Sequence, residues 1–204
     1  LKRLRAEVDL LTLSATPIPR SLHMALSDLR SFSLVATPPR DRLPIRTTLV
    51  RHAPDRIREE IMRELQRGGQ VFFVHNRVSS IEAEADDVRS AVPEARVVVA
   101  HGQMNSRALE KVLVEFIEGQ FNVLVCSAII ESGVDLPNVN TILVNRADQF
   151  GLAQLHHHRG RLWRSHLRGY CILMVDEGTD LSSAAIRRLR TLQEHTALGA
   201  GFAI

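Results

Sequence analysis

The residues best suited to chemistry lie in one short basic stretch. Arg159, Arg161 and Arg164 occur within six positions, beside three consecutive histidines, and no acidic residue lies between Asp148 and Asp176. If this stretch is helical, Arg161 and Arg164 project from one face because they are three positions apart. Two forked guanidinium groups side by side suit the γ-phosphate of a nucleotide, where charge builds up during phosphoryl transfer. Taken alone, the stretch is equally consistent with a solvated basic helix face.

Other candidate residues follow predicted strands, where loops begin. Gly133 permits close approach of the backbone to a ligand, and Asp135 can accept a hydrogen bond from a hydroxyl such as a ribose OH. Gly102 precedes a predicted helix whose first N–H groups can contact a phosphate, and Arg107 in the first turn adds charge. Taken alone, the Gly102 feature is better explained by ordinary turn chemistry with a cap at Asn105. A single Gly-x-Asp is a weak signal because turns produce it often, so neither feature defines a site.

The histidine run and the two cysteines do not predict a metal site. Adjacent residues on a helix point in different directions, and no Cys or carboxylate pattern accompanies residues 156–158, so we expect no bound metal. Cys126 and Cys171 each lie in an apolar, strand-like run. We interpret them as reduced core residues of an intracellular, cytoplasmic protein.

The composition is that of a globular protein. The 204 residues are 45% hydrophobic and 24% charged, and no apolar run is long enough to span a membrane. The first residues lack both Met and a following apolar core, so we expect no signal peptide and a piece of a longer protein. Only Lys2 and Lys111 are lysines among the 26 basic residues, and an Arg-rich surface is compatible with phosphate contact.

Strand-like and helical patterns alternate from residue 45 onward. Apolar runs predict strands at 45–50, 71–74, 97–100, 121–126, 141–144 and 170–175. Amphipathic patterns predict helices at 55–67, 79–92, 105–118 and 182–195. Gly68 and Gly69 are expected to end the first helix, Ser79 and Glu82 to form a capping box on the second, and Asn105 to cap the third. Together these patterns predict an α/β fold with a parallel sheet covered on both faces, whose functional loops follow the strand carboxyl ends.

The first 44 residues do not form a complete domain in this interpretation. Prolines break the pattern after an apparent strand end at 10–14, and three more prolines occur in the linker-like stretch 36–44. We therefore place a domain boundary near residue 44.

The order and spacing of the motifs resemble motifs III to VI of the superfamily 2 helicases. The matching elements are Ser14-Ala15-Thr16, His101-Gly102, Gly133-x-Asp135 and Gly160-Arg161-x-x-Arg164. Stretches 15–20, 101–104, 129–137 and 150–156 are similar to the bacterial transcription-repair coupling factors. The RecG branch-migration helicases are the near alternative, and residues 36–39 and 198–203 favour the coupling factors.

The resemblance implies a RecA-like fold and a motor function. Residues 45–180 would be the second RecA-like helicase domain, residues 1–44 the tail of the first with a linker, and residues 181–204 the start of a helical translocation element. The parent would be an ATP-dependent double-stranded DNA translocase in transcription-coupled DNA repair. Its implied partners are double-stranded DNA and the first RecA-like domain of the same chain. RNA polymerase and nucleotide-excision-repair proteins would bind other domains, and no membrane is involved.

Roles for individual residues also come from the resemblance. ATP would lie between the two motor domains, with Arg161 and Arg164 as catalytic residues and Arg164 as the arginine finger. The implied nucleotide-binding residues are Gly133, Asp135 and His157. The implied DNA-binding residues are His75, Asn76, His101, Gly102, Arg107 and Ser127. The residues implied to couple nucleotide state to movement are Ser14, Ala15, Thr16, Arg20 and Gln154.

Two departures limit what this chain can do. It contains neither a Gly-x-x-x-x-Gly-Lys-[Ser/Thr] loop nor an Asp-Glu-x-His box, so the phosphate cradle and the Mg²⁺ ligands must lie elsewhere. The chain alone is therefore expected to be inactive and to bind nucleotide weakly. His157, His158 and Trp163 stand where the family pattern has Gln, Leu and Gly. Trp163 places a large ring between the two arginines and is the one feature that favours a non-catalytic RecA-like DNA-binding scaffold.

Overall fold

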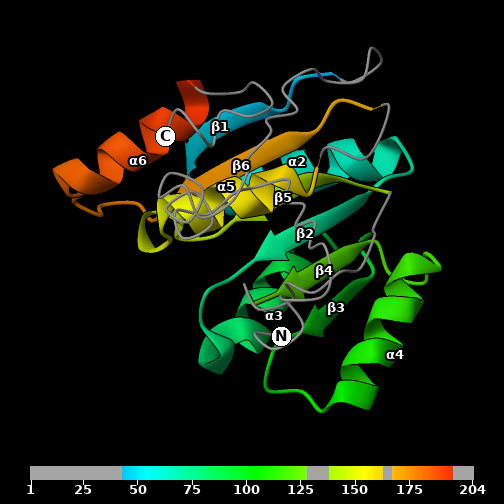
Figure 1. Ribbon diagram of the computed structural model, residues 1–204. Coiled ribbons are helices and arrows are strands. Elements are labelled where there is room, and N and C mark those ends of the chain that lie inside the picture. The colour runs from blue at the N-terminus through cyan, green and yellow to red at the C-terminus, as the bar shows by residue number, and fades with distance from the viewer. Residues whose placement is uncertain (1–42, 128–137, 163–166, 195–204) are drawn as a thin grey trace, which may run out of the picture.

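The computed structural model describes residues 43–127, 138–162 and 167–194 of the chain (Figure 1). Within these ranges six strands form one sheet in the order β1-β6-β5-β2-β4-β3, and every neighbouring pair is parallel. The strands are β1 (Arg46–Arg51), β2 (Gln70–Val74), β3 (Val97–Ala100), β4 (Val123–Cys126), β5 (Val139–Val144) and β6 (Tyr170–Val175). The predicted parallel α/β sheet is therefore confirmed.

Helices cover both faces of this sheet. The helices are α2 (Pro54–Gln66), α3 (Ile81–Ala91), α4 (Ser106–Ile117), α5 (Leu152–Gly160) and α6 (Ser183–Glu194), with short 3₁₀ turns at Val78–Ser80 and Ala147–Gln149. One apolar cluster joins α2 and α3 to one face, and a second joins α4, α5 and α6 to the other. The central strands β2, β4 and β5 are buried along their whole length, which explains their continuous apolar sequences. None of the helices in the described ranges is long and apolar enough to cross a membrane.

The helix ends test three predictions about local sequence. Gly68 ends α2 with a φ of 73°, and the N–H groups of Gly68 and Gly69 bond back to Leu65 and Glu64, as in a Schellman motif. Asn105 caps α4 as predicted, since its Oδ1 accepts a hydrogen bond of 2.8 Å from the N–H of Ala108. Both of these predictions are confirmed.

The predicted capping box at Ser79 is wrong. A 3₁₀ turn occupies Val78–Ser80, so α3 begins at Ile81 and its N-cap residue is Ser80. The side chain of Ser80 makes no cap hydrogen bond and instead lies 2.8 Å from Nε2 of His75. The hydroxyl is used in a tertiary contact that the local sequence pattern does not reveal.

The apolar pattern of 182–195 predicts that Ile186, Leu189 and Leu192 face inward, and the buried face of α6 differs slightly from that expectation. Ala185, Leu189 and Leu192 are buried, whereas Ile186 is only partly buried. The three buried positions are spaced i, i+4 and i+7, so they form one helix face against β1 and α5.

Candidate functional site

A polar residue directly follows each of the six strands. Because all the strands are parallel, these residues lie along a single edge of the sheet, at the carboxyl ends of the strands. In sheet order they are His52, Asp176, Asn145, His75, Ser127 and His101. The predicted DNA-binding residues His75, His101 and Ser127 are thus brought together on adjacent strands.

His75 lies at the centre of a buried polar network. Its side chain is almost completely enclosed, with Nε2 2.8 Å from Oγ of Ser80 and Nδ1 3.3 Å from Nδ2 of Asn145. Oε1 of Glu84 lies 3.6 Å from the same Nδ1. Burial lowers the pKa of His75, and the charge of Arg146 lowers it further. The imidazole therefore holds neighbouring loops together, while Asn76 beside it is exposed.

The network continues across the ends of β5 and β6. Arg146 adopts a left-handed backbone conformation with φ of 51°, and its Nε lies 3.0 Å from Oδ2 of Asp176. Arg51 at the end of β1 donates a hydrogen bond of 3.1 Å to the carbonyl of Asp176. No role was predicted from the sequence for Asn145, Arg146 or Asp176, although their positions after the predicted strands were a usable signal.

The ends of β3 and β4 form the other part of this edge. The N–H of Gly102 donates to Oγ of Ser127 across 3.4 Å, and Ser127 itself is buried. His101 is partly buried, whereas Gly102 and Arg107 are exposed. Ser127 therefore positions the loop after β3, and the exposed part of that loop leads directly into the first turn of α4.

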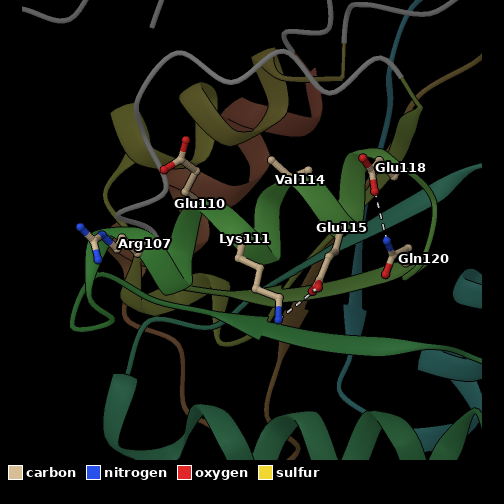
Figure 2. Close-up of a pocket in the computed structure, with 7 residues that line it drawn as sticks. All are labelled: Arg107, Glu110, Lys111, Val114, Glu115, Glu118 and Gln120. Carbon is tan, nitrogen blue, oxygen red and sulfur yellow. Dashed lines mark hydrogen bonds and ion pairs between the residues drawn. The ribbon is translucent and has the colours of Figure 1, made fainter.

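A shallow groove runs along the outer side of α4 (Figure 2). It has a volume of about 470 Å³ and is lined by Arg107, Glu110, Lys111, Val114, Glu115, Glu118 and Gln120. Three carboxylates oppose two cations there, and Nζ of Lys111 lies 3.7 Å from Oε1 of Glu115. With one more carboxylate than cations, this groove disfavours the close approach of a phosphate backbone.

Helix α5 carries the basic stretch. Gln154, predicted to couple nucleotide state to movement, is exposed in the first turn, and its Oε1 accepts a hydrogen bond of 2.9 Å from the N–H of Gly151. The helix ends at Gly160, and Arg161 is its C-cap residue. Arg161 therefore stands at the end of a helix rather than within one.

The three histidines of α5 are not arranged as metal ligands. His156 and His158 are buried, and burial lowers the pKa of each to about 4. His157 is partly exposed, and its ring makes a T-shaped contact with the ring of His158 at a centroid distance of 6.2 Å. In the part of the chain that the structure describes, no three His, Cys, Asp or Glu side chains are grouped so that they could hold a metal ion.

Arg159 has a structural role that the sequence analysis missed. Only 1% of its surface is exposed, and Nη1 donates a hydrogen bond of 2.7 Å to the carbonyl of Leu192 in α6. The guanidinium thus links α5 to α6, the last described helix. Burial also lowers the pKa of Arg159, although it remains a cation at neutral pH.

Arg161 is close enough to β4 to affect its last residue. Cys126 and Cys171 are both free and buried, as predicted, and burial raises the pKa of each thiol to about 12. The positive charge of Arg161 opposes that rise at Cys126. Arg161 and the carboxyl end of β4, which Ser127 follows, therefore lie in the same region of the molecule.

Several predicted site residues lie outside the described ranges. They are the coupling residues Ser14, Ala15, Thr16 and Arg20, the nucleotide-binding residues Gly133 and Asp135, and Arg164 with its neighbour Trp163. Their roles stay predictions.

Comparison with known proteins defines the class first. Residues 53–166 match the family described as helicase conserved C-terminal domain. This match covers more than half of the chain, which therefore belongs to that family and has its RecA-like fold. A DEAD box protein from Methanococcus jannaschii shares the fold at 16% identity, with a TM-score of 0.55 over 74% of this chain and 39% of its own.

More specific similarity extends over the whole chain. It is 52% identical over 204 residues to the transcription-repair-coupling factor of Myxococcus xanthus and 48% identical to that of Escherichia coli (strain K12). All of this chain is covered in both cases, but only 17% and 18% of the two relatives, so it spans about a sixth of their length. Among solved structures, RecG bound to a three-way DNA junction has 32% sequence identity to this chain. The TM-score is 0.73, and the match covers 93% of this chain and 25% of the RecG chain. The family resemblance stated from the motifs is confirmed.

Proposed function

We propose that this chain is the second motor domain of an ATP-driven double-stranded DNA translocase that acts in transcription-coupled DNA repair. The observation that carries the proposal is that α5 both leads to the basic residue Arg161 and is hydrogen-bonded to α6. Arg161 at its end carries a charge suited to phosphate, and Arg159 two positions earlier binds the carbonyl of Leu192 in α6. One helix thereby connects the basic motif to the C-terminal helical extension, as a motor requires.

The residues present suit one half of a nucleotide site. ATP, when bound, supplies the phosphoryl group whose transfer to water releases the free energy for movement. Arg161 and Arg164 supply positive charge toward that group, and Gly133, Asp135 and His157 bind the rest of the nucleotide. Since the sequence has no phosphate loop, the phosphate cradle and the Mg²⁺ ligands belong to the first RecA-like domain.

DNA binding is proposed at the exposed loops of the strand carboxyl edge. Asn76, Gly102 and Arg107 are exposed and suit contact with the phosphate backbone. The other three predicted residues lie beneath the surface of these loops and support them: His75 and Ser127 are buried, and His101 is partly buried. The RecG relative was solved with a DNA junction, which supports DNA as the partner.

The biological context of the proposal comes from the coupling-factor relatives. Their name supports action at the interface of transcription and repair. RNA polymerase and the excision-repair proteins are proposed to bind other parts of the parent protein. A RecG-type fork-remodelling helicase is the second candidate, supported by the structural similarity over 93% of this chain.

The test is ATP hydrolysis by the full-length parent protein in the presence of double-stranded DNA. Arg164→Ala and Arg161→Ala should each reduce kcat by about 10³-fold, because an arginine finger stabilises charge in the transition state. DNA binding should stay within about twofold of wild type, since neither residue is proposed to contact DNA. Arg89→Ala is the control, because Arg89 of α3 contacts Asp86 and the carbonyl of Val97 at the start of β3, at the edge of the sheet opposite the candidate site.

Three results would contradict the proposal. If both arginine variants hydrolyse ATP at the wild-type rate, these residues are not the catalytic pair. If the wild-type parent is itself inactive with DNA, the non-catalytic scaffold becomes the better explanation, with Trp163 as its basis. Fork regression without transcription-coupled activity would favour the RecG-type function.

A further inference from the structure

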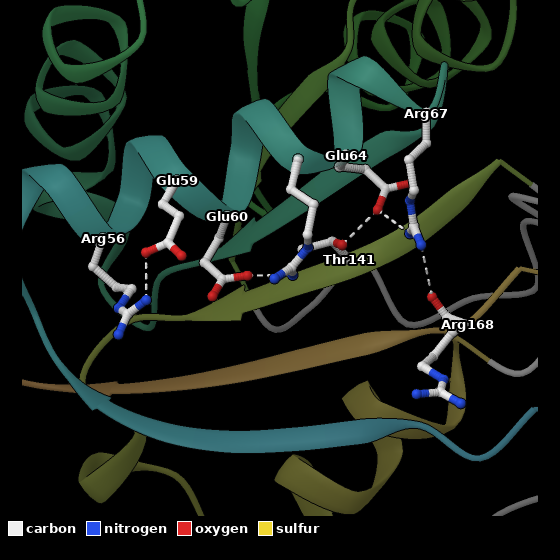
Figure 3. Close-up of polar contacts among 8 residues, drawn as sticks. Arg56, Glu59, Glu60, Glu64, Arg67, Thr141 and Arg168 are labelled. Atoms are coloured by element: carbon white, nitrogen blue, oxygen red, sulfur yellow. Dashed lines mark hydrogen bonds and ion pairs between the residues drawn. The ribbon is translucent and has the colours of Figure 1, made fainter.

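A completely buried carboxylate lies at the edge of the sheet opposite the candidate site. Glu64 occupies the last turn of α2, near the starts of β2, β5 and β6, and its side chain is 0% exposed (Figure 3). A carboxylate at a helix C-terminus faces the negative end of the helix dipole, and burial adds a desolvation cost. Its position therefore requires specific compensation from its surroundings.

That compensation comes from three side chains. Thr141 donates a hydrogen bond of 2.6 Å to Oε2 of Glu64, and Nδ2 of Asn140 donates one of 3.3 Å to Oε1. Arg67, three positions further along α2, forms an ion pair with Oε2. The backbone at Gly69 leaves room for the carboxylate, since a Cβ there would lie 1.8 Å from Oε1 of Glu64.

Arg67 uses its second terminal nitrogen to hold a different segment. Nη2 binds Glu64, while Nη1 donates a hydrogen bond of 3.2 Å to the carbonyl of Arg168 (Figure 3). The guanidinium also lies 5.1 Å from the ring centre of Tyr170, the first residue of β6. Arg67 therefore connects α2 with the chain that enters β6.

The residue after Arg168 packs against the residue after Arg161. Gly169, the next residue, accepts a hydrogen bond of 2.9 Å from the N–H of Arg46. A Cβ on Gly169 would lie 3.1 Å from Cβ of Leu162, so these two residues are in close contact. Leu162 is 2% exposed and directly follows Arg161. The path from Glu64 to Arg161 thus runs entirely through packed or hydrogen-bonded groups.

We propose that Arg67, held by Glu64, is a positioning residue for Arg161 in the motor reaction. A buried ion pair adds little net stability compared with an apolar pair of similar size. Its specific property is geometry, because one planar guanidinium fixes two acceptors from different elements at once. The inference rests on the proposed function, in which Arg161 acts on the nucleotide.

The test uses Arg67→Lys in the full-length parent protein. Lysine keeps the charge opposite Glu64 but has one nitrogen, so it cannot hold Glu64 and the Arg168 carbonyl in the same fixed geometry. We expect kcat for DNA-stimulated ATP hydrolysis to fall roughly tenfold, while the KM for ATP and the Kd for DNA stay within about twofold. Glu64→Gln is the second variant, because it releases Arg67 without removing side-chain volume, and it should give the same loss of kcat.

The matched control is Arg58→Lys on the same helix. Arg58 binds the carboxylate of Glu94 with both terminal nitrogens, at 2.8 and 2.5 Å, and its bonded partners lie at the end of α3 and the loop after it. This variant loses a forked ion pair of the same kind, far from the basic motif, and its kcat should match wild type. A comparable loss of kcat in Arg58→Lys would show that the effect is general destabilisation of α2, and would overturn the inference.

A double-variant comparison separates this inference from the proposed function. If Arg67 acts through Arg161, adding Arg67→Lys to Arg161→Ala should reduce kcat no further. An equal tenfold loss in both backgrounds would overturn the positioning role while leaving Arg161 as a catalytic residue. If Arg67→Lys and Glu64→Gln both keep the wild-type kcat while Arg161→Ala is inactive, the positioning role is also overturned and Arg161 remains a catalytic residue. If Arg161→Ala is fully active, the proposed function fails, and the positioning role fails with it.

Discussion

The buried histidines of α5 make stability depend on pH. His156 and His158 have pKa values lowered from 6.5 to about 4, in both cases mainly because of burial. In the unfolded chain both return to the ordinary pKa of about 6.5. Between pH 6.5 and 4 the unfolded chain therefore binds more protons than the folded chain, so the free energy of unfolding falls as the pH is lowered.

We predict that His158→Leu reduces this acid sensitivity. The variant removes one titrating group and introduces the residue that the family pattern has at this position. Wild type should lose about 1–3 kcal/mol more stability than the variant between pH 7 and pH 4.5. Urea denaturation at several pH values measures the difference. Glu84, whose pKa is raised mainly by burial, opposes the trend equally in both proteins and so cancels in the comparison. Parallel stability curves for the two proteins would contradict the prediction.

Other single side chains show what can and cannot be predicted from the sequence. His75 and Ser127 were placed correctly at strand ends, because local periodicity determines where those ends fall. No helix was predicted at 152–160, so the position of Arg161 at a helix end was not anticipated. The burial of Arg159 was not predictable, since its partner Leu192 is 33 positions away. Glu64 is a similar case, because its hydrogen-bond donor Thr141 lies 77 positions further along the chain. Contacts of this kind depend on how the elements pack.

At the scale of elements, the hydrogen bond from Arg159 to Leu192 links α5 to α6. We predict that Arg159→Met lowers the free energy of unfolding by about 1–3 kcal/mol, because the carbonyl of Leu192 loses its buried donor. Hydrogen exchange of the α6 amides should become faster as that helix separates from α5. Urea denaturation and exchange mass spectrometry measure the two effects. Arg190→Met is the control, since Arg190 is an exposed arginine of α6.

The outcome of that comparison bears on the proposed coupling. If Arg159→Met and Arg190→Met behave alike in both measurements, the hydrogen bond to Leu192 does not hold α6 in solution. The link between the basic motif and the helical extension would then have to be sought in the apolar packing of Leu155, Leu189 and Leu192.

Element types were more predictable than their boundaries. All six strands were expected from their apolar runs, but β5 begins at Val139, two residues earlier than predicted, and β4 begins at Val123, two residues later. Pairing in the sheet sets these limits, since Gln70 of β2 aligns with Val139 and Val71 aligns with Val123. A single sequence shows which residues prefer strands, but the partner strand determines where the strand begins.

At the scale of the whole molecule, the sheet brings distant residues to one edge. Residues 52, 75, 101, 127, 145 and 176 span most of the described chain, yet they lie side by side because six parallel strands end there. The alternating pattern of strands and helices predicts such an edge, but it does not determine the order of the strands. That order places β2 and β5 at the centre, and this is why His75 and Asn145 meet.

The final prediction concerns the 204-residue chain by itself. It should hydrolyse ATP no faster than a buffer control, with or without double-stranded DNA, because arginines alone cannot replace a phosphate loop and Mg²⁺ ligands. Its affinity for nucleotide should be weak for the same reason. Phosphate release measured beside the full-length parent protein is the test, with Arg161→Ala of the same chain as a control for contaminating ATPase. Turnover that disappears in Arg161→Ala would show that this half of the site is catalytic alone, which would contradict a nucleotide site shared between two domains.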